Sequence, residues 1–301
     1  MSDAGGSSAA AAPALSRGLD PVRAARARLL RSFRGTPVAV IGAALVGLVI
    51  AVALAAPVLA PHDPVAQIAT PLLRPGPAPL LGTDEFGRDE LSRLISGARV
   101  SLYVGVLAVL IALGLGATSG VMAGYFGGWV DDVTMRVMDI VLSLPALVLA
   151  IAITSVLGPS LTNVMVAVGI VYAPTFARVA RGPTLTVVRV PYIEAARAIG
   201  ASNLTIVLRH VLPNVAAPIL VQTTVSLSTA ILTEAALSFL GLGTQPPTAS
   251  WGLMLSAARQ YMLIDPWIAV LPGCAIAVTV LGFNLLGDGL RDLLDPQMQV
   301  L

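Results

Sequence analysis

The 301-residue chain contains no lysine, because all 18 of its basic residues are arginine. A phosphate-binding P-loop needs the lysine of GxxxxGK[ST] to reach the phosphates, so the chain cannot contain one. Schiff-base catalysis, which uses a lysine amine, is excluded by the same absence. Any ATP hydrolysis that serves this protein must therefore take place on another polypeptide. We expect the chain itself to be no enzyme and to hold no cofactor.

Cysteine and histidine are also scarce. One cysteine, Cys274, and two histidines, His62 and His210, cannot form a disulfide or a Cys/His metal cluster within one chain. Cys274 lies in an apolar run, where we expect it to be a small buried side chain. The net charge of +2 is too small to indicate binding to nucleic acid.

Charged residues of either sign are rare, and apolar residues make up more than half of the chain. The chain is 56% hydrophobic and only 11% charged, whereas a soluble domain carries about 25% charged residues. An integral membrane protein is therefore predicted. A bilayer core of about 30 Å needs roughly 20 apolar helical residues for each crossing, so the chain has room for about six spans. The alternation that a membrane barrel requires is missing from these runs.

Six transmembrane helices are predicted, which makes the chain all-α. Their predicted ranges are 37–60, 100–125, 134–157, 162–181, 214–241 and 266–286. In the second helix, Gly116, Gly120 and Gly124 are spaced four apart and predict close packing against a neighbouring helix. In the third, Pro145 removes a backbone hydrogen bond and is expected to bend the helix.

Arginine distribution predicts the orientation in the membrane. Residues 1–36 form a basic tail with six arginines, which places this end in the cytoplasm. The loop 61–99 is then extracytoplasmic. Residues 100–290 form the membrane core, with the loop 192–213 inside it facing the cytoplasm, and 291–301 is a cytoplasmic tail. Most arginines then lie on the inner side, as the positive-inside rule requires.

Two local predictions concern charged and polar residues near helix ends. Thr83 or Asp84 is expected to cap a short helix in the outer loop, just before the second span. Arg136 and Asp139, three residues apart, are expected to pair with each other at the membrane interface.

Residues 192–213, YIEAARAIGASNLTIVLRHVLP, are polar and lie between two long apolar runs. Glu194 and the alanines beside it favour a short helix, and Gly200 then relaxes the backbone. Ser202 is the expected N-cap of a second helix. Its apolar stripe is predicted to be Leu204, Val207, Leu208 and Val211. Such a hairpin at the membrane surface suits docking to a soluble partner and not catalysis.

This segment resembles the EAA loop of ABC importer permeases, whose pattern is E-A-A, three residues, Gly, nine residues and then I-x-L-P. The residues that fit the pattern are Glu194, Ala195, Ala196, Gly200, Leu212 and Pro213. His210 replaces the usual Ile, and this RH-hydrophobic-LPN variant resembles the dipeptide and oligopeptide branch. The segments LGTDEFGRD and TEAALSFLGLG resemble the C-type subunits of the same branch.

The resemblance implies a type I ABC importer fold with both termini in the cytoplasm. It implies a permease for di- or oligopeptides in the plasma (inner) membrane of a bacterium, with nickel, glutathione or another small solute as the alternative cargo. The implied partners are a second permease subunit in a heterodimer, ABC ATPase subunits that bind ATP and Mg, an extracytoplasmic solute-binding protein, and the lipid bilayer. In the family the EAA glutamate contacts a basic residue of the ATPase, a role carried over here to Glu194 alone.

The fifth predicted span carries an unusually polar face. The residues that share this face are Gln222, Ser226, Thr229 and Thr233. The face either packs on another helix or lines a hydrated translocation path. Glu234 lies one residue away and is included in the predicted path, because a carboxylate at that depth must be paired, protonated or hydrated and is by default a functional candidate. A rival hypothesis is a proton-coupled secondary transporter that uses Glu234 and Asp139, but it leaves the EAA loop unexplained.

Overall fold

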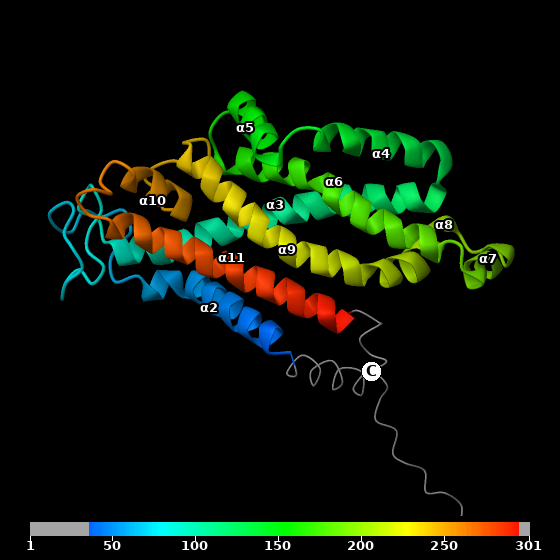
Figure 1. Ribbon diagram of the computed structural model, residues 1–301, viewed down its shortest axis with the longest axis horizontal. Coiled ribbons are helices and arrows are strands. Elements are labelled where there is room, and N and C mark those ends of the chain that lie inside the picture. Colours follow the sequence, from blue (N-terminus) through cyan, green and yellow to red (C-terminus); the bar gives the residue numbers. More distant parts are fainter. Residues whose placement is uncertain (1–35, 295–301) are drawn as a thin grey trace, which may run out of the picture.

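The computed structural model describes residues 36–294, and its regular elements are helices (Figure 1). Five apolar runs along the long axis are each long enough to cross a membrane. These helices are α2 (Pro37–Leu59), α3 (Glu90–Phe126), α6 (Leu161–Val187), α9 (Leu212–Phe239) and α11 (Trp267–Leu294). The all-α membrane fold predicted from the composition is thereby confirmed for this part of the chain.

The third predicted span is broken in two. α4 (Gly128–Leu142) and α5 (Ala146–Leu157) meet at an angle of 88° and have the composition of a span only when taken together. Pro145 has a ψ of 130°, which is not helical, and it is the N-cap of α5, three residues after α4 ends at Leu142. The expected bend at Pro145 is thus confirmed, but the expectation of one continuous helix over 134–157 is wrong.

The start of the second span also differs from the prediction. α3 begins at Glu90 and not near Val100, and the side chain of Asp89 caps it by accepting a hydrogen bond from the Ser92 amide at 3.0 Å. The expected short helix capped by Thr83 or Asp84 is therefore wrong. Asp84 instead accepts from Arg88 Nε at 2.6 Å and lies 3.1 Å from Arg93 Nε. The first pair closes the loop on itself, and the second fastens the outer loop to the first turn of α3.

Glycines bring α3 and α6 into direct backbone contact. A Cβ atom on Gly116 would collide with the carbonyl oxygen of Ala173, and one on Gly120 would collide with that of Ala177. Both glycines are buried. The close packing predicted from the glycine spacing is confirmed, and it creates the centre of the bundle, where Phe176 is fully buried.

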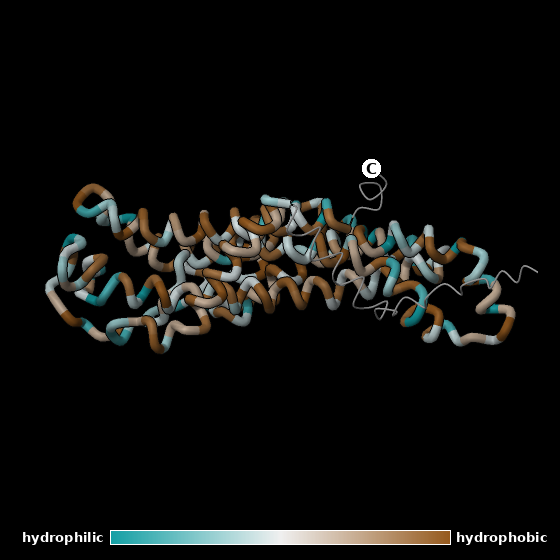
Figure 2. The backbone as a smooth tube through the Cα atoms, turned by 90° about the horizontal axis from the view of Figure 1, so that it is seen from below, coloured by the Kyte–Doolittle hydropathy of each residue, from teal (hydrophilic) through white to brown (hydrophobic). Residues whose placement is uncertain are grey.

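The two ends of the bundle carry the polar segments. Figure 2 shows that hydrophobic residues predominate along the middle of the molecule and that hydrophilic residues are most frequent toward its ends. One end carries the loop 60–89 and α10 (Trp251–Ala258), and the other carries α7 (Pro191–Ala198) and α8 (Asn203–Ile206) (Figure 1). Polar ends with an apolar middle are what a bilayer requires of a spanning protein.

Three remaining predictions concern the ends of the chain and the cysteine. Cys274 is exposed on α11, so the expectation that it is buried is wrong. α11 extends to Leu294, beyond the predicted end of the sixth span at residue 286 and into the predicted tail. The arginine-rich tail and the last residues of the chain, 1–35 and 295–301, lie outside the described residues.

Candidate coupling site and polar path

The hairpin between α6 and α9 has the predicted helix–glycine–helix form. Pro191 starts α7, where its fixed φ is already suited to a helix. Gly200 then has a φ of +83°, in the left-handed region that glycine adopts without a steric penalty. The Ser202 hydroxyl caps α8 by accepting a hydrogen bond from the Thr205 amide at 3.2 Å. The backbone therefore reverses direction within a few residues.

Most of the EAA residues face outward from the bundle. The exposed members are Glu194, Ala195, Gly200, Leu212 and Pro213, while Ala196 is half-buried. In the part of the chain that the structure describes, the Glu194 carboxylate makes neither a hydrogen bond nor an ion pair. Beside it, Ile193 is fully buried and holds α7 against the bundle. The hairpin is thus anchored on one side and presents an unpaired acid on the other.

The predicted apolar stripe of the second hairpin helix is wrong in two positions. Leu204 and Leu208 are 68% and 53% exposed, whereas Ile206 and Val211 are fully buried. The cause is a π-helical turn, η1 (Val207–Val211), between α8 and α9. A π turn adds a residue to the local repeat, so the buried face no longer follows the spacing of a regular α-helix.

Tyr125, at the end of α3, ties the hairpin to the membrane core. Its hydroxyl donates to Asn203 Oδ1 at 2.8 Å, and its ring lies 5.3 Å from the Arg197 guanidinium. One residue of α3 therefore contacts α7 and α8 together. Sequence reasoning missed Tyr125, although an aromatic hydroxyl near the end of a span is a recognisable anchor signal.

Two ion pairs hold α4 against α6. Arg181 contacts both carboxylate oxygens of Asp131 at 2.5 Å, and Arg178 donates to Asp139 at 2.6 Å. The predicted pairing of Arg136 with Asp139 is therefore wrong. A partner on the neighbouring helix displaces the partner three residues away, and Arg136 stays exposed.

The polar face of α9 makes side-chain hydrogen bonds over much of its length. Gln222 donates to Ser226 at 3.0 Å, and Thr233 shares a hydrogen bond of 2.9 Å with the Tyr172 hydroxyl of α6. Ser226 and Thr233 are buried, whereas Thr229 is exposed. Thr233 therefore packs on α6, whereas Thr229 is exposed, and the hydrated path stays a prediction. Tyr172 had no signal in the sequence that set it apart.

Glu234 lies in a closed polar network at the opposite end of α9 from the hairpin. It is fully buried, and one of its oxygens accepts from Ser238 at 2.7 Å and from Thr244 at 3.5 Å. Ser238 in turn accepts from the Thr244 amide at 3.0 Å. Among the described residues, the second carboxylate oxygen and the nearby Ser101 hydroxyl have no hydrogen-bond partner. The carboxyl group thus holds the loop after α9 onto the bundle.

Comparison with known proteins identifies related sequences over almost the whole chain. Residues 116–300 match the family described as the binding-protein-dependent transport system inner membrane component, and residues 26–75 match the N-terminal transmembrane domain of oligopeptide transport permease C. The chain is 45% identical to the glutathione transport system permease protein GsiD of Pectobacterium atrosepticum over 271 residues, 89% of this chain and 90% of the relative. The protein of the same name from Escherichia coli O1:K1 is 46% identical over 282 residues, 93% of each chain.

The fold is similar to that of a solved membrane protein. A structure of the MetNI methionine ABC transporter in an inward-facing conformation matches with a TM-score of 0.54. The match covers 67% of this chain and 97% of the other, at 20% sequence identity. At that identity the similarity concerns the arrangement of the helices alone.

Proposed function

Because the chain belongs to the inner membrane components of binding-protein-dependent transport systems, we propose that it is the C-type permease subunit of an ABC importer for glutathione or a similar small peptide. The chain is a multi-pass permease of the bacterial inner membrane and is not itself catalytic. The identity to glutathione permeases over nine-tenths of the chain supports this cargo. It favours the alternative cargo considered above over di- and oligopeptides in general, although glutathione is itself a tripeptide.

The hairpin provides the coupling to ATP hydrolysis in this proposal. We assign the contact with a separate ATPase, which binds ATP and Mg, to Glu194, Ala195, Ala196, Gly200, Leu212 and Pro213. The unpaired Glu194 carboxylate is available for a basic residue of that partner. Movement of the hairpin passes to α3 through Tyr125 and Ile193, because both are buried and in contact with the bundle. The helices then move as rigid bodies to open the path on alternate sides.

The translocation path runs along α9 in this proposal. Gln222 and Thr229 provide its polar lining, the buried Ser226 holds the Gln222 amide, and Thr233 joins the path to α6 through Tyr172. Glu234 supports the outer loop beside the path and does not carry protons. The proton-coupled rival needs accessible carboxylates, whereas Glu234 is enclosed and Asp139 is paired with Arg178.

Reconstitution tests the function directly. The chain is assembled in liposomes with its partner permease, ATPases and binding protein, and uptake of labelled glutathione, a dipeptide and nickel is measured with and without ATP. We expect ATP-dependent uptake of glutathione to exceed uptake of the other two. Uptake by the chain alone, driven by a proton gradient, would establish the rival mechanism. ATP-dependent uptake of nickel or dipeptide in preference would refute the cargo.

A further inference from the structure

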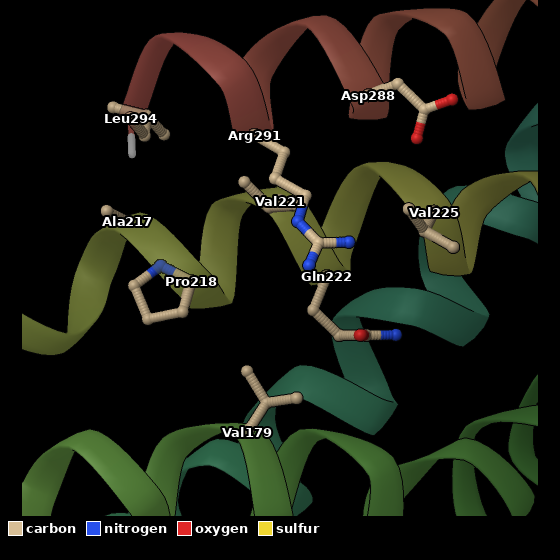
Figure 3. A pocket seen from close by; sticks show the side chains of 9 residues that line it. All are labelled: Val179, Ala217, Pro218, Val221, Gln222, Val225, Asp288, Arg291 and Leu294. Carbon is tan, nitrogen blue, oxygen red and sulfur yellow. The ribbon is translucent and has the colours of Figure 1, made fainter. Parts of the chain in front are cut away.

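A pocket of about 580 Å³ opens between α6, α9 and α11 near the hairpin end of α9 (Figure 3). Its volume falls within the range of small-molecule sites, about 300–1,000 Å³. The residues that line it are Val179, Ala217, Pro218, Val221, Gln222, Val225, Asp288, Arg291 and Leu294. Most of this wall is apolar, and the few polar groups come from α9 and α11. Because Gln222 belongs to the polar face of α9, the pocket lies where that face ends.

Two opposite charges line the pocket without pairing. Asp288 and Arg291 lie three residues apart on α11, a spacing at which such residues often form an ion pair. Within residues 36–294, however, neither side chain makes an ion pair or a hydrogen bond. Figure 3 shows the Arg291 guanidinium pointing from α11 toward Gln222 of α9. The pocket therefore offers a cation, an anion and an amide to a ligand.

The helix that carries both charges is fixed by close contacts on either side of Asp288. A Cβ atom on Gly289 would collide with Ala39 of α2, and one on Gly287 would come within 3.0 Å of the Val225 side chain of α9. α11 is thus packed directly against two other helices at this level. The backbone that carries both charges is therefore fixed before the ligand arrives, which limits the entropy cost of binding to the two side chains.

We infer that this pocket binds a small zwitterionic peptide from the cytoplasmic side, with its carboxylate on Arg291 and its ammonium on Asp288. The Gln222 amide nitrogen already donates to Ser226, so its carbonyl oxygen is left to accept a peptide N–H. A simple anion would be repelled by Asp288 and a simple cation by Arg291. The inference rests on the proposed function for its ligand class, the imported peptide after release.

Binding is measured directly on the complete transporter in phosphatidylcholine nanodiscs, without binding protein, using labelled glutathione. Wild type should bind saturably. Loss of a charge-assisted contact should weaken binding roughly tenfold in Arg291→Gln and in Asp288→Asn. Asp292→Asn is the matched control, because Asp292 is exposed on the same helix and does not line the pocket, and it should bind as wild type does. N-acetylglutathione, which lacks the ammonium group and keeps both carboxylates, should bind Asp288→Asn at least as tightly as wild type, because Asp288 repels an anion.

The possible results test the proposed pocket and the proposed import of glutathione independently of each other. Absence of saturable binding, or equal affinities in wild type and both pocket variants, overturns the pocket whether or not glutathione is imported. Displacement of glutathione by phosphatidylethanolamine in the nanodisc would make the pocket a lipid headgroup site and also overturns it. Charge-dependent binding in a complex that does not import glutathione upholds the pocket and refutes the proposed cargo.

Discussion

At the scale of single residues, substitutions at Glu234 test whether its carboxyl group has a structural role or takes part in transport. Glu234→Gln keeps an oxygen for Ser238 and Thr244, and its new NH₂ group has the unpartnered Ser101 hydroxyl as an acceptor. We expect unchanged transport and an equal or higher midpoint of thermal unfolding for the purified complex. Glu234→Ala removes the acceptor and leaves a cavity, and should cost about 2 kcal/mol or more.

A double-mutant cycle provides the control for Glu234. Any stability gained by Glu234→Gln should disappear in a Ser101→Ala background, because the new amide then lacks its acceptor. Loss of transport in a Glu234→Gln complex that is well folded would show that a titrating carboxyl group is needed, and the structural role would be wrong.

At the scale of elements, α3 and α6 touch at glycines, and an uncrowded glycine on α3 provides a matched control variant. Gly120→Val forces a side chain into the Ala177 carbonyl, while Gly114→Val points into open space. Both variants should insert normally, because each helix is apolar enough to span the membrane alone. Only Gly120→Val should lower the thermal stability of the purified complex, by about 1–3 kcal/mol or more. Equal stability of the two variants would contradict the packing.

The hairpin turn at Gly200 makes a second prediction at this scale. Gly200→Val must adopt a left-handed conformation that costs roughly 1–2 kcal/mol, whereas Gly200→Asn tolerates it better. We expect normal membrane insertion in both, with stimulated ATP hydrolysis by the assembled transporter lost in Gly200→Val and largely kept in Gly200→Asn. Gly182→Ala, at an uncrowded position on α6, is the control. Wild-type stimulation in Gly200→Val would count against coupling through the hairpin.

These elements also show where sequence reasoning succeeds and where it ends. The hairpin could be located from the sequence, because the Ser202 cap and the turn at Gly200 depend only on residues that are close in the chain. Sequence reasoning misplaced the apolar stripe of the second hairpin helix, because a π turn leaves no signature in the spacing of apolar residues. It also paired Asp139 with Arg136. The partner found in the structure, Arg178, is on another helix, and one sequence read by itself does not say which helix lies alongside.

At the scale of the whole molecule, apolar run length predicts the order of the spans, and arginine counts predict their direction. The spans are visible in the structure, whereas the direction is still a prediction. It is tested in a Cys274→Ala background with single cysteines at Ile199, which is 86% exposed on the hairpin, and at Leu263, which is fully exposed at the opposite end.

A membrane-impermeant maleimide should then label Leu263→Cys in intact cells and Ile199→Cys only after the membrane is permeabilised. The reason is that the hairpin must share a compartment with ATP, while the opposite end faces the binding protein. Equal labelling of both positions after permeabilisation serves as the control for reactivity. Labelling of Ile199→Cys in intact cells would place the unpaired Glu194 carboxylate outside. In that orientation no ATPase could reach the hairpin, and the pocket beside Asp288 and Arg291 could not hold a released product.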